Sequence, residues 1–86
     1  MQYILSKRFE KDFAKLVPAT KKKAIATLEQ FTKDPQNPSL RNYGLSGKWK
    51  GHFSINVTGD TRAIYFVIED DMVRFVATPS HSELYG

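Results

Sequence analysis

The sequence predicts an α+β domain in which two N-terminal helices pack on a small antiparallel sheet, in the order β-α-α-β-β-β. Apolar residues recur at helical spacing in the first third of the chain, and the period changes to two from Lys50 onward. Tight-turn residues separate the later segments. The 86 residues are expected to form a single domain over residues 1–86, because chains usually divide at roughly 150 residues per domain.

The N-terminal half predicts a short strand followed by two helices. Residues 2–5 are β-compatible, and Ser6 stands where a helix N-cap is expected. Apolar residues at helical spacing then predict an amphipathic helix of about three turns: Phe9, Phe13 and Leu16. Pro18 suits the first turn of a second helix, whose apolar stripe comprises Ala24, Leu28 and Phe31, with Ile25 beside it. Prolines end this helix, and residues 35–48 are expected to form a polar loop.

The C-terminal half predicts a three-stranded meander. Residues 53–57 alternate apolar and polar side chains, and Gly59-Asp60 is a tight-turn signal. Residues 61–68 return as a central strand, in which Arg62 is the exception among apolar, aromatic and β-branched residues. A further strand over residues 72–78 follows the turn at Glu69-Asp70-Asp71 and ends at Pro79.

Arg62 is the residue on which a functional reading depends. A guanidinium inside a core strand needs an anionic partner, either a structural carboxylate or a phosphate. A two-residue turn at Gly59-Asp60 would place Asn56 opposite Ala63 and diagonal to Arg62, with Thr78 nearby. The same end of the sheet would then gather five side chains: Asn56, Asp60, Arg62, His81 and Tyr85. His52 would pair near Val67, about 17 Å from Arg62 at roughly 3.3 Å per residue.

Composition narrows the function classes. No cysteine is present, which excludes disulfides and a thiolate zinc site, and two histidines offer little for other metals, so no metal or cofactor is predicted. No apolar run suits a signal peptide or a membrane span, and a cytoplasmic protein without membrane contact is expected. Residues 1–50 hold 11 Lys/Arg against four Asp/Glu, whereas residues 51–86 hold two against five. This asymmetry favours a nucleic acid or an acidic protein as partner, with solubility alone as the alternative.

The predicted cluster has the groups needed to cut RNA without a metal. An imidazole can donate or accept a proton near neutral pH. An arginine can hold a phosphate, a carboxylate can orient the imidazole or act as base, and an aromatic ring can stack on a base. Each feature also has a structural reading, since His81 could be a surface residue, Arg62 and Asp60 a structural pair, and Tyr85 a core residue.

Three motifs add a family resemblance that covers nearly the whole chain. They are Leu45-Ser46-Gly47-Lys48-Trp49-Lys50-Gly51, Gly59-Asp60-Thr61-Arg62-Ala63-Ile64-Tyr65 and His81-Ser82-Glu83-Leu84-Tyr85. At this mutual spacing the chain resembles the RelE/ParE toxin superfamily, and within it the YafQ-like mRNA interferases of type II toxin–antitoxin systems. The resemblance implies a ribosome-dependent mRNA endonuclease that inhibits translation and is neutralised by a cognate antitoxin. Cleavage in this family proceeds by attack of a ribose 2′-hydroxyl on the adjacent phosphate.

The resemblance also implies residue roles. His81 would protonate the leaving 5′-oxygen, Arg62 would clamp the phosphate, Asp60 would orient or act as base, and Tyr85 would stack on a base. Two lysines in the first motif, with basic residues of the N-terminal half, would bind ribosomal RNA phosphates: Lys48 and Lys50, with Lys7, Arg8, Lys11 and Lys15. YafQ-like enzymes carry two further histidines, and the corresponding positions here are Tyr43 and Asn56, which can bind substrate but cannot carry protons as imidazole does.

Two other functions remain open from the sequence. The chain could be a ParE-like toxin that inhibits DNA gyrase by contact without catalysis, which the missing histidines favour and the intact C-terminal motif disfavours. It could also be a decayed toxin that only binds its antitoxin.

Overall fold

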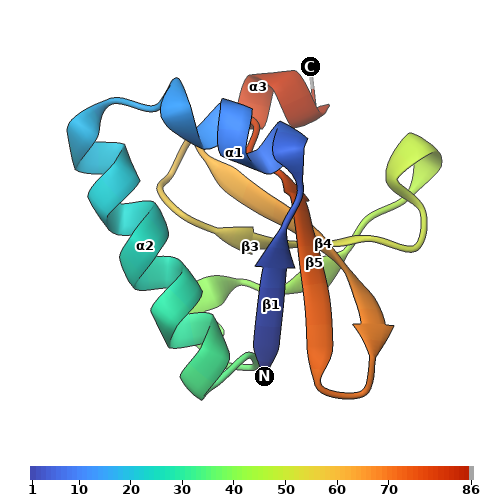
Figure 1. Ribbon diagram of the computed structural model, residues 1–86. Helices are drawn as coiled ribbons and strands as arrows, with labels where there is room; N and C mark the ends of the chain where they lie inside the picture. The colour runs from blue at the N-terminus through green and yellow to red at the C-terminus, as the bar shows by residue number, and fades with distance from the viewer. Residues whose placement is uncertain (86) are drawn as a thin grey trace.

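The computed structural model describes residues 1–85, apart from the side chains of His81 and Tyr85. The α+β class is confirmed, with the α1–α2 pair packed on a sheet (Figure 1). In chain order the elements are β1 (Gln2–Leu5), α1 (Lys7–Ala14), α2 (Pro18–Lys33), η1 (Pro38–Leu40), β2 (Tyr43–Gly44), η2 (Gly47–Trp49), β3 (Phe53–Asn56), β4 (Arg62–Glu69), β5 (Met72–Ala77) and α3 (His81–Tyr85), where η denotes a 3₁₀ helix. Within the described residues, none of the helices is long and apolar enough to cross a membrane.

The antiparallel meander of the last three strands is confirmed, but the sheet as a whole is mixed and not antiparallel as predicted. Its strand order is β1-β5-β4-β3-β2, and β1 runs parallel to β5 while the other neighbours are antiparallel. Helices α1 and α2 separate β1 from the other strands in the sequence. The direction of β1 is therefore not set by a short turn between neighbouring strands. Ser6 fixes its end, because the Ser6 amide donates to Phe75 O at 2.9 Å and the Ser6 hydroxyl donates to Val76 O at 3.0 Å.

Helix α1 begins as predicted but is shorter than expected. The Ser6 hydroxyl accepts a hydrogen bond from the Phe9 amide at 3.0 Å, which confirms Ser6 as the N-cap. The helix spans 8 residues, about two turns, and Leu16 lies beyond it. Pro18 is the first residue of α2 and holds Val17 in extended backbone at φ −68° and ψ 154°, because the residue before a proline avoids helical backbone.

The hydrophobic core lies between the α1–α2 pair and one face of the sheet. Phe75 is its centre, with ring centroids of Phe9, Phe31 and Tyr65 at 5.8, 5.4 and 5.3 Å. The predicted stripe of α2 is confirmed, because its three apolar residues are buried: Ala24, Leu28 and Phe31. Ile25, beside the stripe, is 50% exposed. Since strand side chains alternate, every second residue of β4, beginning with Arg62, points to the other face.

The β3–β4 turn differs by one residue from the prediction. Asn56 pairs directly with Arg62, and Ile55 pairs with Ala63. The reason is a three-residue loop over residues 58–60, whose Thr58 hydroxyl accepts from the amides of Asp60 at 3.1 Å and Thr61 at 3.0 Å. The slip brings the Asn56 side chain to the same face as the Arg62 side chain.

The β4–β5 hairpin and the predicted loop over residues 35–48 also differ from the predictions. The predicted pairing of Ile68 with Met72 is wrong, because Glu69 pairs with Met72 across a register shift. The predicted placement of Thr78 near Arg62 is confirmed, because the Thr78 hydroxyl donates a hydrogen bond to Arg62 O at 2.9 Å. The predicted loop over residues 35–48 contains η1, β2 and the start of η2. The C-terminal segment, for which no element was predicted, forms α3.

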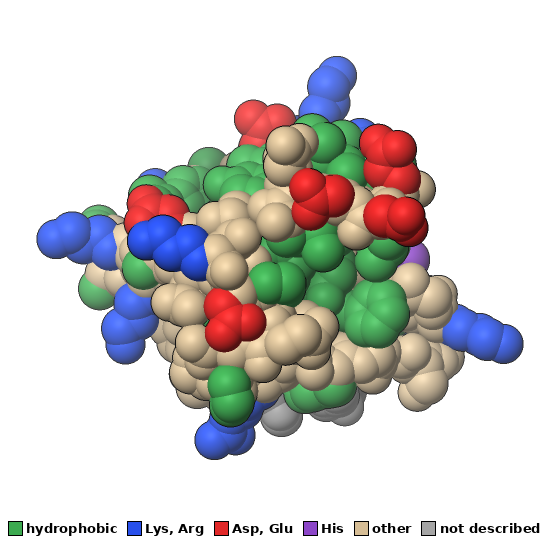
Figure 2. Space-filling view, turned by 90° about the horizontal axis from the view of Figure 1, so that it is seen from below, with side chains coloured by type: hydrophobic (Ala, Val, Ile, Leu, Met, Phe, Trp, Pro, Cys, Tyr) green, Lys and Arg blue, Asp and Glu red, His purple; other side chains and the backbone are tan. Residues whose placement is uncertain are grey.

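Three of the five acidic residues of the second half gather at one end of the sheet. The β4–β5 turn carries Glu69, Asp70 and Asp71, and Asp71 Oδ1 lies 3.3 Å from the N-terminal amine. Figure 2 views the molecule from this end and shows acidic side chains grouped on it, with Lys and Arg side chains around the outline. Because Arg62 and Glu69 are the two ends of β4, these carboxylates lie about 23 Å from Arg62 at roughly 3.3 Å per residue.

Candidate functional site

Arg62 is buried in a cage of oxygen atoms. Its side chain is only 5% exposed. The Ser54 hydroxyl accepts from Nε at 3.2 Å and from Nη2 at 2.8 Å, and Ser54 O accepts from Nη2 at 3.1 Å. Arg41 O accepts from Nη2 at 2.8 Å, and Asn56 Oδ1 accepts from Nη1 at 3.4 Å. We call Ser54, Asn56, Arg41 O and the ring of Tyr43 the Arg62 cage.

Local backbone geometry places each member of the cage. Ser54 and Asn56 alternate along β3 and therefore share the face to which Arg62 points. Arg41 has φ 48°, a left-handed conformation that follows η1. The Tyr43 ring, on β2, lies 4.7 Å from the guanidinium carbon, within cation–π range. These described partners are all neutral, so they fix the orientation of the guanidinium without supplying negative charge.

Asp60 is not among the described partners of Arg62. It lies exposed on the β3–β4 loop and lines a cleft of about 360 Å³. The charged residues around this cleft come from α1, the β3–β4 loop and α3: Arg8, Asp12, Lys15, Asp60 and Glu83. Asp60 thus lines the same cleft as Arg8 and Lys15.

The start of α3 is tied to the start of β4. The Arg62 amide donates to Pro79 O at 3.0 Å, and Thr61 forms an antiparallel bridge with Ser80. His81 is the first residue of α3 and follows this bridge directly, so its backbone lies where the sequence predicted, beside the start of β4. The predicted roles of the His81 and Tyr85 side chains lie outside the described part of the structure.

A capping box begins α3. The Ser80 amide donates to Glu83 Oε1 at 3.0 Å, and the Glu83 amide donates to the Ser80 hydroxyl at 3.2 Å. The hydrogen bonds from Ser80 hold the pKa of the Glu83 carboxyl below its ordinary value of 4.5, and the charges of Arg8 and Lys15 act in the same direction. The sequence pattern Ser-x-x-Glu after Pro79 is a capping-box signal that could have predicted this helix.

We expect Glu83→Ala to loosen α3, seen as faster hydrogen exchange of the Glu83 and Leu84 amides. Glu83→Gln is the matched control, since glutamine also completes a capping box. Because the folded pKa is depressed, the cap's stabilisation is present above the unfolded value and is lost as pH falls through the folded one. Protection of these wild-type amides, taken relative to the intrinsic exchange rate at each pH, should therefore fall below about pH 4.5, and the Gln variant should lack this fall. Equal exchange in all three proteins would show that the box does not hold the helix.

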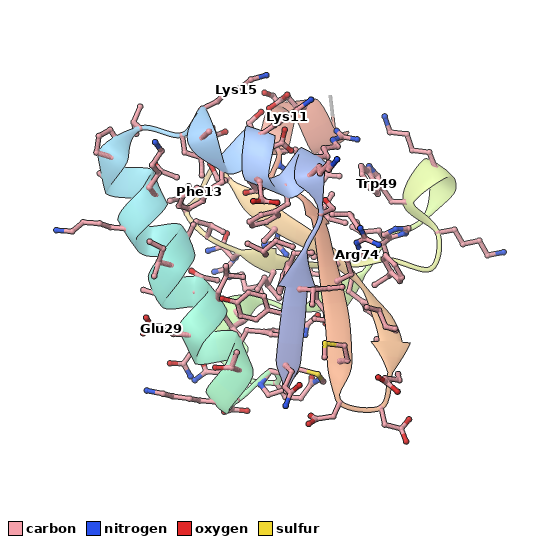
Figure 3. The ribbon with its side chains drawn as sticks, viewed as in Figure 1. Lys11, Phe13, Lys15, Glu29, Trp49 and Arg74 are labelled. Carbon is pink, nitrogen blue, oxygen red and sulfur yellow. The ribbon has the colours of Figure 1, made fainter. Side chains whose placement is uncertain are left out.

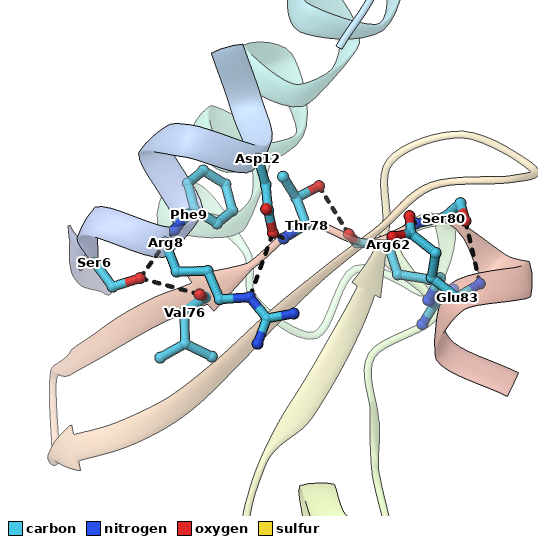
Figure 4. Close-up of polar contacts among 9 residues, drawn as sticks. All are labelled: Ser6, Arg8, Phe9, Asp12, Arg62, Val76, Thr78, Ser80 and Glu83. Carbon is cyan, nitrogen blue, oxygen red and sulfur yellow. Dashed lines mark hydrogen bonds and ion pairs between the residues drawn. The ribbon is translucent and has the colours of Figure 1, made fainter. Parts of the chain in front are cut away.

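A chain of hydrogen bonds connects α1 to Arg62 (Figure 4). Asp12 Oδ2 accepts from the Thr78 amide at 3.1 Å and lies 3.8 Å from Arg8 Nε. The Thr78 hydroxyl donates to Arg62 O at 2.9 Å. Thr78 is 4% exposed, so its amide depends on Asp12 for a partner. Asp12 thereby holds the β5–α3 junction against the start of β4.

Asp12→Ala is expected to lower the free energy of unfolding by about 1–3 kcal/mol, because it leaves the buried Thr78 amide without its acceptor. Asp12→Asn keeps an acceptor oxygen and should lose less. Urea unfolding measures the difference, and Glu10→Ala on the same helix controls for removing an exposed carboxylate from α1. Equal losses in Asp12→Ala and Glu10→Ala would contradict a role for the Thr78 contact.

The remaining predicted residues lie on a separate loop. Lys48 and Lys50 are exposed on and next to η2 and flank Trp49. His52 contacts Trp49 and Phe66, with ring centroids 5.4 and 5.5 Å apart. Phe66 is four residues from Arg62, about 13 Å at roughly 3.3 Å per residue. The prediction that His52 lies far from Arg62 is therefore confirmed. The residue beside His52 is Phe66, however, and not Val67 as predicted.

Three residues of the site were missed by sequence reasoning: Ser54, Arg41 and Asp12. Ser54 was identifiable in principle, since it lies on the polar face of an alternating segment. Arg41 contributes a backbone carbonyl, for which no sequence signal exists, and the Asp12–Thr78 contact joins residues 66 positions apart. Among the described side chains, no group of three His, Cys, Asp or Glu residues could hold a metal ion.

Comparisons with known proteins agree on one group. A family model described as "Bacterial toxin of type II toxin-antitoxin system, YafQ" matches residues 1–86. The chain is similar to the solution structure of HP0894 from Helicobacter pylori, with 30% identity, 98% of each chain covered and a TM-score of 0.76. A YafQ histidine-to-glutamine variant from Escherichia coli shows 26% identity, with 99% of this chain and 98% of that chain covered and a TM-score of 0.73.

A complex is also among the similar structures. The Escherichia coli DinJ–YafQ complex contains a chain that is 27% identical, with 99% of this chain and 98% of that chain covered and a TM-score of 0.69. No curated protein sequence matches the chain.

Proposed function

The chain belongs to the YafQ family of bacterial type II toxins, and from that premise we propose that it is an endoribonuclease that cleaves mRNA on the ribosome. The observation that carries the proposal is the Arg62 cage. It holds a permanently charged guanidinium in one orientation through hydrogen bonds from Nε, Nη1 and Nη2, beside the backbone of His81. A preoriented cation suits a phosphate that gains charge during in-line attack.

The proposed reaction needs no group beyond the chain and the RNA. The ribose 2′-hydroxyl loses its proton and attacks the adjacent phosphorus, and the P–O5′ bond breaks to leave a 2′,3′-cyclic phosphate. His81 protonates the leaving 5′-oxygen, Arg62 holds the phosphate oxygens, and Tyr85 stacks on a base. Asp60 is assigned the base from its place next to Thr61, which forms a bridge with Ser80, while Asn56 and Tyr43 position the substrate from the cage.

The proposal includes a protein partner. The solved Escherichia coli complex joins a YafQ chain to DinJ, and we extend this to a cognate antitoxin for the present chain. The cluster of basic residues on α1 and α2 favours a partner that is acidic where it contacts them.

The test maps mRNA ends in a reconstituted translation system with purified toxin. Cleavage within codons that appears only when ribosomes are present supports the proposal. Intact mRNA together with inhibited gyrase supercoiling would replace it with the non-catalytic gyrase function. Intact mRNA, active gyrase and retained antitoxin binding would identify a decayed toxin.

A further inference from the structure

The face of the sheet that carries Arg62 also carries a row of aromatic rings. His52 contacts Trp49 and Phe66 edge to face, with centroids 5.4 and 5.5 Å apart and interplanar angles of 78° and 67°. All three are only partly buried. We call these three residues the aromatic strip.

An arginine flanks each end of the strip. Arg8 reaches from α1 and places its guanidinium carbon 5.7 Å from the Trp49 ring centroid, and its side chain is 64% exposed. Arg74 is exposed and pairs with Phe66 across β4 and β5, so the two side chains lie on the same face. Figure 3 shows Trp49 and Arg74 on the side of the sheet away from α2.

The strip lies on the same face of the sheet as the Arg62 cage. Arg62 and Phe66 are four residues apart on β4, which puts their side chains on the same face about 13 Å apart. Lys48 and Lys50 flank Trp49 on the same loop. The exposed part of this face therefore combines aromatic rings with cations, whereas Arg62 and Ile64 beside it on β4 are buried.

We propose that the aromatic strip, with Arg8 and Arg74, binds nucleotides of single-stranded RNA that lie beyond the scissile phosphate. Unpaired bases stack on aromatic and guanidinium planes, while arginines contact the backbone phosphates. An acidic protein would complement the cations but would leave three partly exposed rings without a stacking partner. The inference rests on the proposed function, because it takes the substrate to be RNA held at Arg62.

Trp49 is the only tryptophan of the chain, so its fluorescence reports on the strip directly. The probe is a short single strand of 2′-O-methyl RNA, which cannot be cleaved through its 2′-hydroxyl. We expect it to quench Trp49 emission in the wild-type protein. Phe66→Ala should weaken binding about tenfold, as expected for the loss of one stacked base. Circular dichroism establishes that this variant is folded.

Arg74→Gln is the second variant. Because Arg74 is exposed, its replacement should leave the fold unchanged. It should weaken binding and reduce the slope of log K against log salt by about 0.7, as expected for one lost phosphate contact on a single strand. Lys22→Gln is the matched control, since it removes the same charge from an exposed position on α2. Equal weakening by both substitutions would overturn the inference, because the effect would then be non-specific charge.

Two further arms separate this inference from the proposed function. Arg62→Lys should lose cleavage and still show quenching that depends on Phe66 and Arg74. The wild-type protein could cut no mRNA on ribosomes and still show quenching that depends on Phe66 and Arg74. That result would support RNA binding by the aromatic strip and contradict the proposed nuclease function. If ribosomal cleavage is present and both strip variants bind RNA like wild type, the strip alone is overturned. Weakened antitoxin binding with unchanged RNA binding would likewise overturn it and assign the strip to a protein.

Discussion

Replacing Arg62 with lysine is expected to lower mRNA cleavage on the ribosome about 100- to 1,000-fold, although the positive charge is kept. The reason is geometric. The guanidinium donates through Nε, Nη1 and Nη2 in different directions at once, to Ser54, Asn56 and Arg41 O. A lysine ammonium is a single point on a flexible stem and cannot reproduce this fork. The rate of appearance of cut mRNA in reconstituted translation measures the effect.

Ser54→Ala separates orientation from charge at the same site. It keeps Arg62 and removes the fully buried hydroxyl that accepts from Nε and Nη2. We expect a smaller loss of cleavage than in Arg62→Lys, because the carbonyl oxygens of Ser54 and Arg41 still hold the guanidinium. Thermal unfolding of each variant shows whether the fold persists. A folded Arg62→Lys protein that cuts mRNA at the wild-type rate would remove Arg62 from the mechanism.

Periodicity predicted the helices and the meander because their partners are decided locally. Ser6 caps α1 through a hydroxyl three residues from its partner amide, and Pro18 begins α2 through its own fixed backbone. The stripe of α2 is buried since helical spacing alone puts those residues on one side. Such features depend on a few neighbouring residues, and the sequence contains all of them.

The register of β3 and β4 depends on the length of the loop between them, which the residue types only partly determine. Gly59-Asp60 resembles a two-residue hairpin turn, whereas the Thr58 hydroxyl stabilises a loop that is one residue longer. That single residue moves Asn56 from the diagonal of Arg62 to the position directly opposite. The consequence is functional, since it makes Asn56 part of the cage.

The partners of Arg62 were the least predictable part of the site. Electrostatics alone called for an anion, and Asp60 was the nearest carboxylate in sequence. The partners that the structure describes include the hydroxyl of Ser54 and the carbonyl of Arg41, whose position depends on the left-handed turn after η1. The direction of β1 was unpredictable for the same reason, because its contacts with β5 join residues about 70 positions apart. Long-range backbone contacts leave no pattern in a single sequence.

His81→Gln is expected to lower the maximal rate of mRNA cleavage about 100- to 10,000-fold, the range for loss of a positioned general acid. Glutamine can still hydrogen-bond the leaving oxygen but cannot give up a proton to it near neutral pH. An imidazole that acts as an acid works only while protonated, so wild-type cleavage should decline as pH rises. The residual cleavage of the Gln variant should lack this decline.

The other histidine of the chain provides the control for this substitution. His52→Gln removes an imidazole from the aromatic strip, so we expect weaker binding of substrate with the maximal rate and the pH dependence preserved. The two variants have the same composition, and any difference between them therefore comes from position. A His81→Gln protein that keeps the wild-type maximal rate and pH profile would exclude His81 as the acid. A His52→Gln protein that loses the pH dependence would instead identify His52 as the general acid. The acid would then lie on the aromatic strip, about 13 Å along β4 from Arg62.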